Sequence, residues 1–298
     1  MTRTDDPIGR PPPALPERPE MPSPPAPPPE PPRRDPGAPG WPLWTAFVAL
    51  ITAFVLGNVL GGIVYGIADL NGHDIDDPPA GYLMAANLVF QGSLLGSALL
   101  FAHFYGGVSP AKLGLRAVGW LTGLKWAAAA LITYYVFQAV WISALGLEDE
   151  SDEITDRLEA DPSTATVVGI AIFAVVIAPI VEEVFFRGFV FGALRSSMPP
   201  VAAAAGTGLL FGGVHAFGSP IGFLVPLAML GFLLSLLYWK TGSLLPCIAL
   251  HVVNNSIALS VALGWGWQIP VLTAAALAAV AGILLPVVRS NGRRAAPA

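Results

Sequence analysis

Cysteine, charge and signal-peptide features are scarce in this sequence, and each scarcity excludes a class of protein. The single cysteine, Cys247, excludes an intrachain disulfide and a cysteine-rich metal site. Of the 298 residues, 12% are charged and 54% are hydrophobic, whereas a typical soluble domain has about 25% charged residues. The first 40 residues contain no apolar run of the kind that a cleavable signal peptide needs. The composition therefore indicates a membrane protein built without disulfides.

Apolar segments of about 20 residues, each long enough to cross a bilayer, recur along the chain. We predict eight transmembrane helices, over residues 43–68, 82–105, 119–145, 163–186, 199–217, 221–239, 243–263 and 268–288. Residues 1–40 are dense in proline and cannot bury a core, so we expect a disordered tail there. The predicted fold class is an all-α, polytopic transmembrane helical bundle preceded by this tail.

Most lysine and arginine residues outside the predicted helices fall on one side of the bundle. With eight helices, the basic residues before the first helix, after the last one and in the connections 106–118, 187–198 and 240–242 all share a side. The acidic stretches 69–77 and 148–161 lie on the other side. Because lysine and arginine favour the cytoplasmic side, we predict a multi-pass protein of the cell membrane with both termini in the cytoplasm.

Glu182 and Glu183 are the only carboxylates inside a long apolar segment, IVIAPIVEEVFFRGFVFGAL. Such residues are costly in hydrocarbon and usually face a protein interior or a water-filled cavity, where they have a function. Arg187 follows on the same helical face, so a structural ion pair is the alternative. The two glutamates lie about 100° apart around an α-helix. We therefore expect one to face a cavity and the other to serve Arg187 or a neighbouring helix.

Two of the four histidines lie in polar motifs of the apolar C-terminal half. FGGVH begins at Phe211 and ends at His215, and HVVNN begins at His251 and ends at Asn255. A lone histidine in an apolar helix is more typical of a hydrogen bond between helices. Together with the glutamates, however, these residues could hydrolyse an amide, because a carboxylate beside an imidazole can deprotonate water and a histidine with a carboxamide can donate to an oxyanion. A zinc site formed by Glu182, His215 and His251 is equally open, although the usual HExxH pattern is absent.

The motifs EEVFFR, FGGVH and HVVNN resemble the EExxxR, FxxxH and HxxxN/D motifs of the CPBP family of intramembrane proteases. That family includes the type II CAAX prenyl endopeptidases and the bacteriocin-processing or immunity proteins of the Abi group. The resemblance covers about residues 163–260. The catalytic residues that it implies are Glu182, His215, His251 and Asn255, with Glu183, Arg187 and Phe211 in support.

The resemblance also implies roles for these residues, and together with the apolar segments it predicts four parts of the chain. Glu182 would activate a water beside His215, while His251 and Asn255 would donate to the oxyanion, or His251 would bind a metal. The four parts are a cytoplasmic proline-rich tail (1–40), N-terminal transmembrane helices (41–160), a catalytic helical core (161–263), and a last transmembrane helix with a basic cytoplasmic tail (264–298).

The implied function is that of an intramembrane endopeptidase. Its expected partners are the lipid bilayer and a membrane-associated protein or peptide substrate, and no nucleic acid is expected as a partner. In the prenyl-protein branch an asparagine often follows the second-motif histidine by four residues, and Ser219 occupies that position here. A prenylated CAAX substrate is therefore not favoured.

Two functions of other classes are also considered. A non-catalytic membrane immunity or assembly factor could share the fold, but it would not need all four catalytic side chains. A proton-coupled transporter could use glutamate, arginine and histidine as a relay, but the two halves of the sequence show no internal repeat.

Overall fold

The predicted fold class is confirmed by a computed structural model, which describes residues 39–148 and 150–295, with side chains as far as residue 290. All regular elements in this part of the chain are helices. Eight helical segments in these residues are long and apolar enough to cross a membrane, which is the predicted number. The expected tail over 1–40 lies almost wholly outside the described residues.

The eight segments run close to their predicted bounds. They are α1 (Leu43–Leu70), α2 (Ala80–Gly106), α3 (Trp120–Leu145), a composite helix (Thr164–Arg195), α8 with η3 (Pro200–Phe217), α9 (Ile221–Thr241), α10 (Leu244–Ala262) and α11 (Gln268–Ala295). Two ends differ from the prediction. The composite helix continues to Arg195 instead of ending at residue 186, and α11 continues past residue 288 into the stretch that we expected to be a basic tail.

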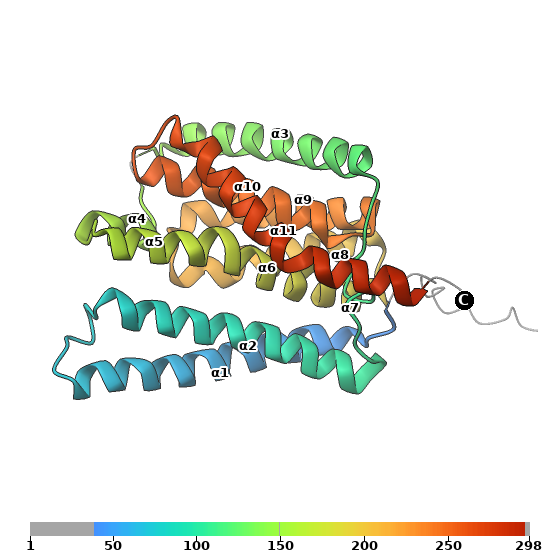
Figure 1. Cartoon of the computed structure of the whole chain (residues 1–298), viewed down its shortest axis with the longest axis horizontal. Coiled ribbons are helices and arrows are strands. Elements are labelled where there is room, and N and C mark those ends of the chain that lie inside the picture. The colour runs from blue at the N-terminus through green and yellow to red at the C-terminus, as the bar shows by residue number, and fades with distance from the viewer. Residues whose placement is uncertain (1–38, 149, 296–298) are drawn as a thin grey trace, which may run out of the picture. The chain divides into compact units, whose positions relative to one another are not determined.

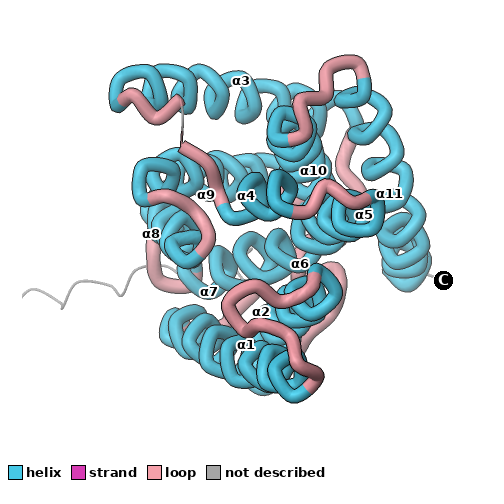
Figure 2. The backbone as a smooth tube through the Cα atoms, turned by 90° about the vertical axis from the view of Figure 1, so that its left-hand side faces the viewer, coloured by secondary structure: helices cyan, strands magenta, loops and turns pink. Residues whose placement is uncertain are grey.

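The helices pack in pairs around the composite helix and α10. α1 packs along α2, and α8 packs along α9, while α3 contacts α9 and α10, and α11 contacts α10. Figure 1 shows the α1–α2 hairpin at one edge of the bundle and α3 at the opposite edge, and Figure 2 shows the same arrangement from the end of the helices. In the most apolar window of α10, 56% of the residues are buried, against 6% in α3. The core therefore lies around α10 and the composite helix.

Glycines allow the α8–α9 hairpin to close tightly. A Cβ atom added at Gly212, inside the FGGVH motif, would lie 2.6 Å from the carbonyl oxygen of Leu224 on α9. One turn earlier, a Cβ atom at Gly208 would lie 2.6 Å from the carbonyl oxygen of Ala228. Only glycine permits this approach, so part of the FGGVH motif serves helix packing.

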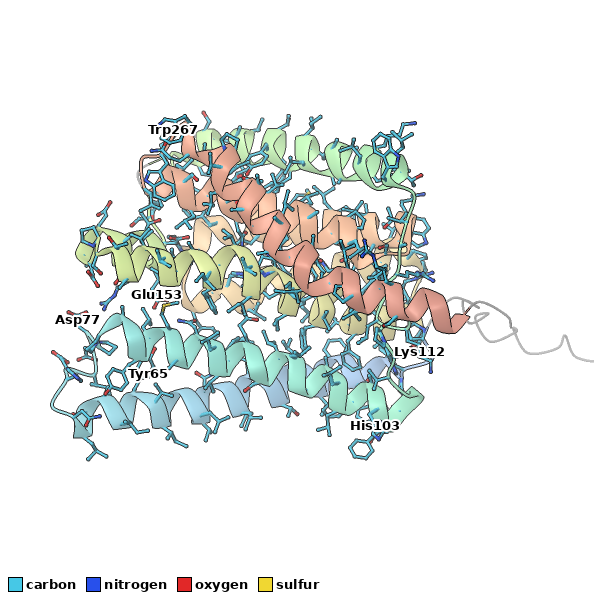
Figure 3. All side chains as sticks on the ribbon, viewed as in Figure 1. Tyr65, Asp77, His103, Lys112, Glu153 and Trp267 are labelled. Atoms are coloured by element: carbon cyan, nitrogen blue, oxygen red, sulfur yellow. The ribbon has the colours of Figure 1, made fainter. Side chains whose placement is uncertain are left out.

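The two acidic stretches meet at one end of the bundle. A short helix, α4 (Glu153–Ala160), is capped by Asp152, whose side chain accepts from the backbone N–H of Thr155 at 2.9 Å. Arg157 of α4 forms an ion pair of 2.6 Å with Asp77, in the connection between α1 and α2. Figure 3 shows Asp77 and Glu153 at this end and Lys112 at the other. Acidic residues thus gather at this end, where Arg157 pairs with one of them, and Lys112 lies at the opposite end.

The connection into the composite helix is also held by side-chain hydrogen bonds at this end. The hydroxyl of Thr166 and the backbone N–H of Ser163 donate to the partly exposed carboxylate of Asp161. These hydrogen bonds, first that of Thr166, lower the pKa of Asp161 because they favour its charged form. These hydrogen bonds therefore hold the first turn of the composite helix, which begins at Thr164, well before the glutamates.

Candidate active site

The composite helix carries Glu182 and Glu183 where the short segment α6 meets the second of two wide π-helical stretches. It runs through α5 (Thr164–Ile172), η1 (Phe173–Ile177), α6 (Ala178–Glu182), η2 (Glu183–Val190) and α7 (Phe191–Arg195). Proline explains the first wide turn. In η1 the N–H of Ala178 bonds the carbonyl of Phe173, five residues back, and the same register would pair Ala174 with Pro179, which has no N–H. The carbonyl of Ala174 is therefore left without a donor from its own helix.

Asn255 of α10 supplies that missing donor. Its Nδ2 donates to the carbonyl oxygen of Ala174 at 2.8 Å, and its Oδ1 accepts from Asn254 at 3.1 Å. The hydroxyl of Tyr135 on α3 donates in turn to Asn254 at 3.2 Å. The predicted catalytic carboxamide is thus bound to an irregular turn of the glutamate helix, with one amide hydrogen still available.

Glu183 lies at the centre of a buried network of charges. Its Oε1 is 2.9 Å from Nη1 of Arg187, the pair expected from the sequence, and both side chains are fully buried. The same oxygen is 2.8 Å from Nδ1 of His251 on α10. Arg187 continues the network to α9, where Nη2 donates to the carbonyl of Gly231 at 3.4 Å, and its guanidinium lies 4.5 Å from the ring centre of Phe211. Burial of these charges requires such compensation.

Glu182 faces the opposite nitrogen of the same imidazole. Its Oε2 lies 3.9 Å from Nε2 of His251, and its side chain is 12% exposed. Its other oxygen, Oε1, accepts a hydrogen bond of 3.0 Å from Nε2 of Gln91 on α2. Glu183, as a carboxylate, accepts from His251, so Nδ1 of a neutral ring carries the hydrogen and Nε2 is an acceptor. Two acceptors, from Glu182 and His251, therefore face one small gap.

His215 lies at the start of the short helix η3 (His215–Phe217), beside the other motifs. Its Nδ1 lies 2.7 Å from the carbonyl oxygen of Phe211, so in a neutral ring Nδ1 donates and Nε2 is left as an acceptor. The ring of Phe211 contacts both imidazoles, with centroid distances of 4.8 Å to His215 and 5.9 Å to His251. The described contacts include no hydrogen bond between His215 and Glu182, the two residues that we expected to lie side by side.

Six of the seven predicted site residues are therefore joined through His251 and Phe211, and Asn255 lies one turn after His251 on α10, bound to the glutamate helix at Ala174. The expected division between the glutamates is also present, since Glu183 serves Arg187 and a neighbouring helix. Gln91 and Tyr135 were missed. Neither belongs to a motif, and a polar group within a membrane-spanning helix is the only signal that could have indicated them.

A metal ion does not fit the predicted ligands as they are arranged. Glu182 and His251 offer two atoms that face each other, but His215 does not join them. In residues 39–148 and 150–290, no three side chains of His, Cys, Asp or Glu are placed to hold a metal ion. We therefore derive no step through a metal.

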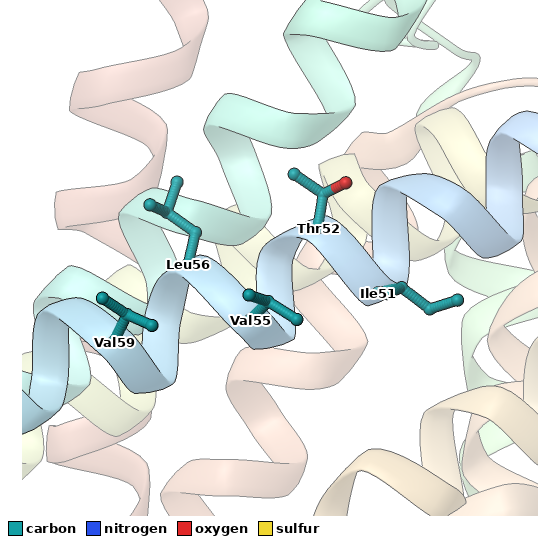
Figure 4. A pocket seen from close by; sticks show the side chains of 5 residues that line it. All are labelled: Ile51, Thr52, Val55, Leu56 and Val59. Carbon is teal, nitrogen blue, oxygen red and sulfur yellow. The ribbon is translucent and has the colours of Figure 1, made fainter.

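Two surface depressions among the described residues lie away from this gap. One is a shallow apolar depression on α1, shown in Figure 4 and lined by Ile51, Thr52, Val55, Leu56 and Val59. Its side chains belong to a helix that is largely exposed, so lipid is its expected neighbour. A second depression is lined in part by Tyr135, Gln138 and Glu148 near the end of α3.

Comparison with known proteins confirms the resemblance inferred from the three motifs. Residues 164–257 match the family model described as Type II CAAX prenyl endopeptidase Rce1-like. A protein of Bacillus subtilis (strain 168), named "Putative membrane peptidase YdiL", is 30% identical over 132 residues, which cover 44% of this chain and 48% of that protein. The chain thus matches about half the length of this curated relative. No solved structure matches the chain.

Proposed function

We propose that this protein is an intramembrane endopeptidase, which hydrolyses a peptide bond of a membrane-associated protein or peptide with a water activated by Glu182. One observation carries the proposal. Oε2 of Glu182 and Nε2 of His251 lie 3.9 Å apart, inside eight membrane-type helices, and Glu183 holds the other side of the imidazole. The match of residues 164–257 to a peptidase family supports the same reaction class.

The gap between Glu182 and His251 suits one water molecule. A water oxygen about 2.8 Å from each atom would hydrogen-bond to both of them. Glu182 would take one proton of this water while the water oxygen adds to the scissile carbonyl carbon. The tetrahedral oxyanion then collapses, the C–N bond breaks, and Glu182 gives the proton to the leaving nitrogen. His251 would orient the water, because Glu183 fixes its Nδ1–H, as the acidic member of a catalytic triad does.

This arrangement revises the roles that the sequence suggested for the two histidines. His251 faces Glu182 and is the better candidate to hold the water, whereas His215 was expected there. The remaining amide hydrogen of Asn255 is a neutral donor that could stabilise the oxyanion. His215 can donate from Nε2 only when its ring is protonated, because Nδ1 is already bound to the carbonyl of Phe211.

We further propose that both termini are cytoplasmic and that the end of the bundle with Asp77 and α4 faces outward. The separation of basic and acidic residues between the two ends supports this orientation. Labelling of intact cells with a membrane-impermeant thiol reagent should modify Asp76→Cys and not Arg293→Cys. Modification of both positions would contradict the proposed orientation.

The proposed activity is tested by a comparison of membrane proteins in cells that produce the parent protein or Glu182→Gln. Glutamine keeps the shape of Glu182 but cannot accept a proton from water. New N-termini within membrane-associated proteins should form only with the parent, and they would identify the cleavage site. If both cell lines give the same N-termini while both proteins reach the same abundance, the proposed activity is wrong.

A further inference from the structure

Gln91 is a buried polar residue of α2. The buried residues on the same side of the helix are Leu94, Ala98 and Ala102, three, seven and eleven positions later. Its side chain is 6% exposed, and its one described hydrogen bond goes to Glu182. A buried carboxamide is costly in apolar surroundings unless its groups are paired. The position therefore calls for an explanation beyond packing.

The neighbouring residue explains why Gln91 points toward the glutamate helix. Phe90 packs against α1, where a Cβ atom at Gly57 would lie 2.5 Å from its ring, and it forms an edge-to-face pair with Phe54 at 5.2 Å. This tight contact fixes the rotation of α2 about its axis. Gln91 then faces α6 and η2, which α2 contacts directly.

We propose that Gln91 is a positioning residue for Glu182, an inference that rests on the proposed peptidase function. Its amide group holds Oε1 of Glu182, which leaves Oε2 directed at Nε2 of His251. The amide must present its N–H, since a carboxylate only accepts. The carbonyl oxygen of Gln91 is buried without a partner among the described residues.

The inference assigns part of the active site to the N-terminal helices. Gln91 lies outside residues 164–257, which carry the family match and the three motifs. The α1–α2 hairpin thus contributes a side chain to the reaction centre instead of serving only as a membrane anchor.

The test begins with stability, which does not depend on any substrate. Gln91→Leu should lower the melting temperature of the purified protein in detergent micelles, because the partly buried Glu182 carboxylate loses its donor. In a Glu182→Leu background the same substitution should cause no further loss. Equal losses in both backgrounds would show that the two residues are not coupled, and would overturn the inference.

Turnover is then measured on a fluorogenic peptide that carries the cleavage site found with the parent protein. Gln91→Leu should lower kcat by about 100-fold, as expected for a misplaced catalytic group, while KM stays unchanged. Gln91→Glu keeps the shape but sets one carboxylate against another, and should be equally impaired. Asn87→Leu is the matched control: this carboxamide lies one turn earlier on α2, donates to its own helix at Leu83, and should keep the parent kcat.

The outcomes separate this inference from the proposed function. If Glu182→Gln abolishes turnover but Gln91→Leu keeps the parent kcat, Gln91 is not a positioning residue and the peptidase proposal stands. If Asn87→Leu loses as much activity as Gln91→Leu, the effect belongs to α2 as a whole and the inference fails. If Glu182→Gln itself remains active, the proposed function fails first.

Discussion

Removal of the Arg187 charge should destabilise the protein more than any other single change at the site. Arg187 is fully buried, 2.9 Å from Oε1 of Glu183 and 4.5 Å from the ring centre of Phe211. In Arg187→Met the apolar bulk remains, but Glu183 keeps a buried charge with His251 as its only described partner. Breaking a buried ion pair from one side costs about 3–5 kcal/mol, and equilibrium unfolding in mixed micelles should show a loss of this size.

A second variant separates the lost charge from the lost packing. In Arg187→Met with Glu183→Gln, no uncompensated charge remains, so most of the loss should be recovered and about 1–3 kcal/mol should persist for imperfect hydrogen bonds. Turnover should stay low in the double variant, because glutamine cannot hold His251 as a carboxylate does. Lys125→Met, at an exposed position of α3, is the control and should change stability by less than about 0.5 kcal/mol. If Arg187→Met is as stable as the parent, the buried network does not stabilise the fold as argued.

Three further predictions follow from single contacts. Gly212→Ala should destabilise by about 1–3 kcal/mol through overpacking against α9, whereas Gly213→Ala, with open space at the added Cβ, should not; equal unfolding curves would contradict the packing argument. Asn255→Ala should lower both turnover and the free energy of unfolding, the latter by about 1–3 kcal/mol, because a carbonyl in the wide turn loses its donor; a change in turnover alone would show that this hydrogen bond is unimportant. A strong chelator should leave turnover unchanged, and inhibition that added zinc reverses would contradict the metal-free mechanism.

The fold and the ion pair follow from properties that the sequence displays directly. Long apolar segments and separated charges predicted eight helices, because lipid permits few alternatives. The pairing of Glu183 with Arg187 followed from their spacing on one helix.

The contacts between helices could not be predicted in this way. Glu182 and Glu183 reach opposite nitrogens of the imidazole of His251, and the order of motifs along the chain does not encode that contact. Pro179 was a visible signal of an irregular turn, yet the link from that turn to Asn255 depends on how α10 lies against it. Gln91 stands in a helix without any motif, so only packing against α1 shows which way it points.

The most direct test of the account is the turnover of purified Glu182→Gln on the peptide that carries the identified cleavage site. The account predicts a folded protein, with the melting behaviour of the parent, whose kcat is lower by at least the roughly 10²–10⁴-fold expected when a general base is lost. A Glu182→Gln protein that cleaves the peptide at the parent rate would contradict the proposed mechanism, and the fold would then serve a non-catalytic function.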